Sequence, residues 1–147
     1  MKLLVLATDP VAAADVRDAL GAEDVEGAEV LVVSPAVNES PVAFWVSDSD
    51  EAIREAESTA RQTAEALAAA GARTRAQAGE SEPLLALQDA LATYPADRVL
   101  VFSRGDESAR YREEDVIGEV ERRFGVPVTE VTRRPPPGPG APPRRSS

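Results

Sequence analysis

Cysteine and histidine are both absent from this chain of 147 residues. Without cysteine it can form no disulfide and no iron–sulfur cluster, and it has no thiol nucleophile. Without histidine, zinc sites, Ser-His-Asp triads and imidazole general bases are excluded as well. Lys2 is the only lysine, which rules out a catalytic lysine. These absences remove a large share of enzyme mechanisms, and we expect a protein that is not an enzyme.

Basic residues are scarce. The formal net charge is −10, and two of the arginine pairs, at 133–134 and 144–145, lie at the end of the chain. Sequence-independent binding to nucleic acid or to an anionic membrane needs a basic surface, so we expect neither as a partner. No stretch approaches the roughly 18 apolar residues of a membrane span, and the start, MKLLVLATDP, fits a strand better than a signal peptide. We therefore expect a cytoplasmic protein.

Proline is concentrated in the last fifteen residues, RRPPPGPGAPPRRSS. Such a composition cannot bury a core and is typical of a disordered or polyproline II segment. We therefore predict one α/β domain over residues 1–132 and a disordered tail rich in proline and arginine over 133–147. The tail could also act as a proline-rich ligand for a partner protein.

Short apolar runs alternate with helical patterns along the predicted domain. The runs at 2–7, 29–33 and 98–102 are typical of buried strands, whereas ARTRAQA (72–78) is polar and indicates an edge strand. A last strand is expected at 126–131, and the helices between the strands at 11–20, 50–70, 81–94 and 116–124. This alternation predicts a doubly wound parallel sheet of five strands with helices on both faces, the 2–7 and 98–102 strands being central.

Polar residues follow the two strands that we expect at the centre of the sheet. Thr8 and Asp9 come directly after 2–7, and Ser103, Arg104 and Gly105 come directly after 98–102. Ligands of such sheets bind beyond the carboxyl ends of the strands, where the strand order reverses. We therefore expect these residues to converge on one crevice.

Four segments together resemble the universal stress proteins of the UspA type. They are the aspartate after the first strand, Gly79-Glu80 followed by Pro83, VFSRG (101–105) and GVPVTEV (125–131). The order of elements matches as well. The resemblance implies the strand order 3-2-1-4-5, a fold similar to that of the adenine nucleotide α-hydrolases, and a stress-response protein that regulates or interacts. It also implies a homodimer formed through the last strand.

ATP-binding members of that family carry a spaced signature after the fourth strand: glycine, two residues, glycine, nine residues, glycine, and then serine or threonine. The first two glycines let backbone N–H groups approach the phosphates, and the final serine or threonine donates a hydroxyl. In this chain the spacing is intact, but two of the four residue types differ. The resemblance implies cofactor-binding positions at Thr8, Asp9, Ser103, Arg104, Gly105, Ser108, Gly118 and Glu119.

Glu119 weighs against nucleotide binding. An ionised carboxylate can only accept hydrogen bonds, and a negative charge about 4 Å from a phosphate costs roughly 4 kcal/mol at an effective dielectric near 20. With the hydroxyl bond also lost, affinity falls about a thousandfold unless Mg²⁺ bridges the charges or Glu119 turns away. Arg104 and Arg110 offset part of the repulsion. We expect a degenerate site without a bound cofactor, and ATP or AMP with Mg²⁺ is the alternative.

Several of these residues also have simpler explanations. Asp9 followed by proline fits the N-cap and first position of a helix, and residues 103–105 fit a tight turn. Gly118 lies within a helix, where glycine costs about 1 kcal/mol relative to alanine, so it indicates close helix packing or the close approach of a ligand. The acids at 113–115, 119 and 121 fit a solvated helix face better than a metal site.

Two functions are consistent with these features. The first is a non-enzymatic interaction protein with a lapsed nucleotide site, whose acidic crevice and tail contact an unidentified protein partner. The second is an ATP-binding module, a nucleotide-dependent switch with slow ATP hydrolysis. An ion pair between Arg104 and Glu119 would favour the first function, because it would close the crevice.

Overall fold

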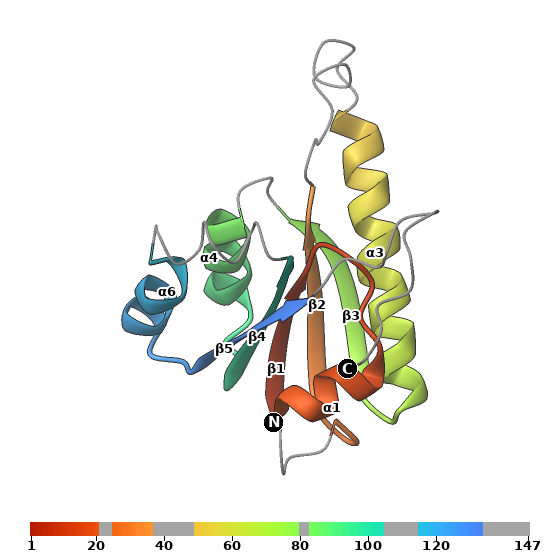
Figure 1. Ribbon diagram of the computed structural model, residues 1–147, viewed down its shortest axis with the longest axis horizontal. Helices are drawn as coiled ribbons and strands as arrows, with labels where there is room; N and C mark the ends of the chain where they lie inside the picture. The colour runs from red at the N-terminus through yellow and green to blue at the C-terminus, as the bar shows by residue number, and fades with distance from the viewer. Residues whose placement is uncertain (21–24, 37–48, 80–82, 105–114, 134–147) are drawn as a thin grey trace, which may run out of the picture.

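The computed structural model describes residues 1–20, 25–36, 49–79, 83–104 and 115–133. Its strands and helices alternate along the chain (Figure 1): β1 (Lys2–Ala7), α1 (Ala13–Leu20), β2 (Glu29–Pro35), α3 (Ser49–Ala69), β3 (Arg73–Gly79), α4 (Pro83–Thr93), β4 (Arg98–Arg104), α6 (Val116–Phe124) and β5 (Val128–Arg133). The strands form one sheet in the order β3-β2-β1-β4-β5, and every pairing is parallel. The predicted fold class and strand order are confirmed, and so is the edge position of the polar third strand.

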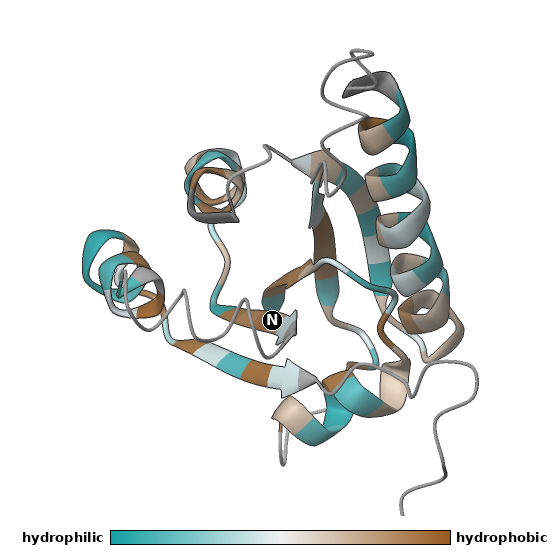
Figure 2. Ribbon diagram, turned by 45° about the horizontal axis from the view of Figure 1, so that its top comes forward, coloured by the Kyte–Doolittle hydropathy of each residue, from teal (hydrophilic) through white to brown (hydrophobic). Residues whose placement is uncertain are grey.

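The sheet has a hydrophobic core on each face. Side chains of β1 alternate between the two cores, Leu3 and Val5 on one face and Leu4 and Leu6 on the other, and all four are buried. Helices α1 and α3 cover the first face, and α4 and α6 cover the second (Figure 1). Figure 2 shows the apolar sides of these helices turned toward the strands. Burial on both faces is the reason that β1 reads as a continuous apolar run.

Several predicted boundaries differ from those of the structure. Strands β2 and β4 each extend two residues beyond their predicted ends, and β5 begins at Val128 and ends at Arg133, one residue into the predicted tail. The rest of the tail, 134–147, lies outside the described residues. Helices α3 and α6 end as predicted, because Gly71 and Gly125 adopt φ values of +100° and +66° that favour glycine.

The start of the first helix was predicted wrongly. Helix α1 begins at Ala13, so Asp9 and Pro10 do not occupy its N-cap and first position. The backbone N–H of Val11 donates instead to the Thr63 hydroxyl on α3, at 3.0 Å. Val11 and Thr63 are both buried, so this bond holds the β1–α1 connection against α3. The helix therefore begins only after this connection, at Ala13.

Arg98 fastens the other end of α1 to the sheet. Its guanidinium donates to the carbonyl oxygens of Ala19 and Leu20, at 3.2 and 3.3 Å, and to the hydroxyl of Thr129 on β5, at 3.4 Å. The last carbonyls of a helix have no partner within the helix, and a cation there also complements the helix dipole. One side chain therefore ties β4, α1 and β5 together.

Removal of two buried hydroxyl groups, those of Thr63 and Ser34, should change the free energy of unfolding in opposite directions. The Thr63→Val substitution keeps the shape of the side chain but leaves the Val11 N–H without its acceptor, so we expect a loss of about 1–3 kcal/mol in the free energy of unfolding. The hydroxyl of Ser34 is buried and has no hydrogen-bond partner among the described residues, so Ser34→Ala should gain up to about 1 kcal/mol. Urea unfolding measures both changes. A destabilised Ser34→Ala variant would show that this hydroxyl has a partner.

Candidate functional site

The carboxyl ends of β1 and β4 bring the first group of predicted residues to one edge of the sheet. Ala7 lies opposite Phe102 in the β1–β4 ladder, so Thr8 follows β1 at the level of Ser103. Asp9 is exposed, Thr8 is half-buried, and Ser103 is buried. Arg104 continues β4 opposite Arg133 of β5, and its side chain lies outside what the structure describes.

The hydroxyl of Ser103 is already engaged by an acid. It donates to Oε2 of Glu130 on β5 at 3.2 Å, and Ser103 itself is 2% exposed. Glu130 lies beside Val101 in the β4–β5 ladder and on the same face of the sheet as Ser103. The analysis of the sequence missed Glu130, because the register between β4 and β5 decides which strand residue meets Ser103. An anion at this edge would meet the Glu130 carboxylate.

Gly118 lies under an ion pair at the start of α6. Arg122 donates to Oδ2 of Asp115 at 2.8 Å. A Cβ atom added at Gly118 would lie 2.5 Å from Oδ1 of Asp115 and 3.0 Å from Nη1 of Arg122. The glycine therefore makes room for a contact within its own helix, which is a third explanation beside the two predicted for it.

Asp115 has an unusual backbone conformation that produces this arrangement. It precedes α6 with φ 51° and ψ 40°, the left-handed region, which aspartate tolerates better than most residues. Its side chain makes no hydrogen bond to the helix N-terminus, so the carboxylate is directed to Arg122 instead. This hydrogen bond raises the pKa of the Arg122 guanidinium, and the charge of Asp115 adds to the effect.

Glu119 lies in the first turn of α6 with its side chain half-buried. Its backbone N–H donates to the carbonyl oxygen of Asp115 at 2.9 Å, an ordinary bond of the helix. Glu121, two residues on, accepts the N–H of Val128 at 3.1 Å and so fixes the start of β5. The described part of the chain contains no group of three or more acids that could hold a metal ion. The acids of α6 thus have structural partners or a solvated position.

The structure divides the predicted site into two parts. Residues 8, 9, 103 and 104 lie at the β1–β4 edge, whereas Gly118 and Glu119 belong to α6, which lies beside α4 on the β5 side of the sheet (Figure 1). Gly105 and Ser108 fall outside the described residues, and so does the side chain of Arg104. Whether Arg104 pairs with Glu119, which would favour the first of the two functions, is therefore untested. The ion pair that the structure does describe joins Asp115 and Arg122.

A second polar region lies at the amino ends of β2 and β3. Glu29, Val30, Arg73, Arg75 and Tyr94 line a hollow of about 260 Å³. The hydroxyl of Tyr94 donates to the carbonyl oxygen of Glu29 at 3.0 Å, and its ring is 5% exposed. From the sequence, Tyr94 was predicted only as the last residue of a helix. The signal for this region was present in the alternating arginines of the third strand.

The Tyr94 ring also lies near two cations. The Nζ atom of Lys2 and the Cζ atom of Arg75 are each 5.8 Å from the ring centroid, a separation at which cations are attracted to an aromatic face. Burial raises the pKa of the Tyr94 hydroxyl, the negative charges of Glu29 and Asp97 raise it further, and Arg75 lowers it.

Comparison with known proteins supports the fold and nothing finer. No protein-family model matches the chain, and no curated protein matches it. Its structure is similar to the crystal structure of a hypothetical protein, PH0823, with a TM-score of 0.51 and 16% sequence identity over 89% of this chain and 96% of the other. The chain has an α/β fold. None of the described helices is long and apolar enough to cross a bilayer.

A double-mutant cycle tests whether the Asp115–Arg122 ion pair explains Gly118. Alanine within a helix is about 1 kcal/mol more favourable than glycine, but here its Cβ would displace the Asp115 carboxylate. We therefore expect Gly118→Ala to leave the free energy of unfolding nearly unchanged. In an Asp115→Gly background, which keeps the left-handed backbone, the same change should stabilise the protein by about 1 kcal/mol. Equal effects in both backgrounds would contradict the explanation.

Tyr94 should ionise at a higher pH than an ordinary phenol. Its pKa is raised above 10.0, so folding favours its protonated form. Its contribution to stability is complete below the unfolded pKa of about 10 and is lost as the pH rises through the folded pKa. The difference in phenolate absorbance between the wild type and Tyr94→Phe reports on Tyr94 alone, and we expect its midpoint to lie above about pH 10. A midpoint near pH 10, about the unperturbed value, would contradict this expectation.

Proposed function

We propose that the chain is a non-enzymatic regulatory or interaction protein of the universal stress protein type, in which the nucleotide site is closed and ATP binding is weak or lost. The fold has the strand order that this family implies. The family-like signature is kept in its spacing at Gly105, Ser108, Gly118 and Glu119. The proposal explains why the spacing is kept while the residue types at two of these positions have changed.

The observation that carries the proposal is the position of the Asp115 carboxylate. It occupies the space beside Gly118 where a side chain is missing, 2.5 Å from an added Cβ, and Arg122 holds it there. A phosphate approaching this glycine would meet a carboxylate, and the guanidinium that could attract it is already paired. Like charges at such a separation repel strongly even near the surface.

Carboxylates at the strand ends support the same conclusion. Glu130 accepts the hydroxyl of Ser103, so that this hydroxyl is directed to an acid of the protein. Asp9 adds a further exposed acid at the end of β1. An acid at this position disfavours a nucleotide and favours a partner with basic groups.

We also propose that two copies associate through β5. This strand is an edge of the sheet, with its outer side not paired to another strand in the described chain. Its side chains from Val128 to Val131 are half-buried, intermediate between those of a core strand and those of a solvated edge. A second copy of β5 would cover this edge, which otherwise offers unpaired backbone groups to other chains.

Calorimetric titration of ATP with Mg²⁺ tests the closed site. The wild type should show no saturable binding at micromolar ATP. A variant carrying Asp115→Gly and Glu119→Ser removes two carboxylates and restores the hydroxyl of the signature, so we expect it to bind at least about tenfold more tightly than the wild type.

Asp89→Asn is the matched control for charge. Asp89 is exposed on α4, and its neutralisation changes the net charge without touching α6. This control should bind ATP no better than the wild type. Micromolar binding by the wild type would overturn the proposal and establish the chain as an ATP-binding module. Failure of the double variant to gain affinity would show that the carboxylates do not close the site.

A further inference from the structure

The two faces of edge strand β3 differ in what covers them. Helix α3 packs on the face that carries Thr74, Ala76 and Ala78. Arg73, Arg75 and Gln77 share the other face with Leu31 and Val33 of β2, and their side chains are exposed. The second face of β3 therefore carries three exposed polar side chains, two of them arginines toward the amino end of the strand. This face adjoins the core under α4.

The backbone of β3 offers hydrogen-bonding groups on its outer side. The N–H of Arg73 donates to Ala28 at 2.8 Å, and the carbonyl oxygen of Gly79 accepts from Ala36 at 3.3 Å, so the odd-numbered residues direct their backbone groups toward β2. In a parallel ladder the intervening residues direct theirs away. The N–H and C=O groups of Thr74, Ala76 and Ala78 thus face outward, and β3 pairs only with β2 among the described strands.

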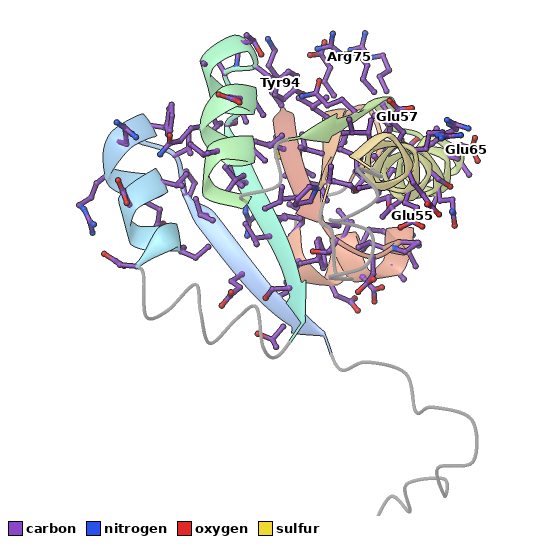
Figure 3. The ribbon with its side chains drawn as sticks, turned by 90° about the horizontal axis from the view of Figure 1, so that it is seen from above. Glu55, Glu57, Glu65, Arg75 and Tyr94 are labelled. Atoms are coloured by element: carbon purple, nitrogen blue, oxygen red, sulfur yellow. The ribbon has the colours of Figure 1, made fainter. Side chains whose placement is uncertain are left out.

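Positive charge gathers at this place in a chain whose net charge is −10. Arg73 and Arg75 line the hollow beside Tyr94 together with Glu29, which lies opposite Arg73 in the ladder, and Lys2 lies over the same ring. Neither arginine forms an ion pair within the part of the chain that the structure describes. Figure 3 shows Arg75 and Tyr94 close together, with Glu55, Glu57 and Glu65 grouped around α3. The arginines thus form a local basic patch on an acidic molecule.

We propose that the outer side of β3 binds an acidic, extended segment of a partner protein, which adds to the sheet as a further strand. Alternate side chains of a strand lie about 7 Å apart on the same face, so acids at alternate positions of the segment match the spacing of Arg73 and Arg75. The outward backbone groups of Thr74, Ala76 and Ala78 supply the ladder, as in other cases of strand addition. The contact with Tyr94 holds Arg75 in place for this pairing.

The same charges argue against a second copy of this chain on β3. Two β3 strands paired side by side would bring arginines of both copies together on one face, where like charges destabilise the pairing. An acidic partner is favoured and self-association is disfavoured by the same two residues. The two arginines lie in the amino-terminal half of β3, away from the carboxyl ends of β1 and β4 where a nucleotide would bind.

Binding to synthetic peptides tests the proposal. An array of seven-residue peptides, the length of β3, would carry Glu or Asp at alternate positions and Val, Ile or Thr between them. A matched array would replace each acid by its amide. We expect fluorescence anisotropy to detect binding of acidic peptides by the full chain, and affinity to fall as salt is added. Reversal of both arginines, Arg73→Glu with Arg75→Glu, should weaken binding by about tenfold or more.

Two further variants separate strand addition from general attraction. Arg61→Glu on α3 reverses an exposed charge elsewhere and should leave peptide affinity unchanged. Ala76→Pro removes an outward N–H that the fold does not use, at an exposed edge position where proline is tolerated, and should abolish binding while circular dichroism stays unchanged. The proposal is overturned if no acidic peptide binds, if the amide peptides bind equally well, or if folded Ala76→Pro binds as the wild type does. The arginines would then serve only to keep the edge from aggregating.

Discussion

Burial of β1 on both faces is the constraint on which the rest of the structure depends. A strand that is apolar on both faces needs a layer of helices on each side, and its neighbours in a parallel sheet are reached through helical crossovers. The carboxyl ends of all strands then lie along one side of the sheet, here called the carboxyl edge, and the amino ends lie along the opposite side, the amino edge. Polar side chains that follow the strands collect at these two edges, which makes the edges candidate places for chemistry.

The two edges have opposite character. At the carboxyl edge, Ser103 is bound by Glu130, and the start of α6 is covered by Asp115. At the amino edge, Arg75 lies against Tyr94 beside a hollow. We propose that contacts with partner proteins take the place of contacts with a nucleotide in this protein. Most side chains of the two cores lie between these edges, although Tyr94 of the amino edge belongs to the core under α4.

The alternation of apolar runs was sufficient to predict a parallel sheet with β1 and β4 at its centre and the polar β3 at an edge, whereas the full strand order came from the resemblance to the universal stress proteins. The helical pattern also placed Gly118 within a helix, where glycine is unfavourable and its presence needs a structural explanation. The pattern could not supply that explanation, because the left-handed backbone of Asp115 directs a carboxylate over the glycine, and hydrophobic periodicity does not predict such a backbone conformation. The N-cap assigned to Asp9 was wrong because a tertiary bond to Thr63 overrides the local Asp-Pro signal. Register and long-range bonds were the missing information.

The most direct test of the closed site is a map of backbone amide shifts in the isotopically labelled wild type during titration with ATP and Mg²⁺. The amides of Thr8, Asp9, Ser103 and Glu119 report on both parts of the edge at once, whatever the heat of binding. The account predicts that these four signals move only slightly and without saturation up to millimolar ATP, as expected of affinity about a thousandfold below the micromolar range. Saturable shifts at these amides with a micromolar midpoint would contradict it, because the carboxylates would then lie beside a bound phosphate without preventing its binding.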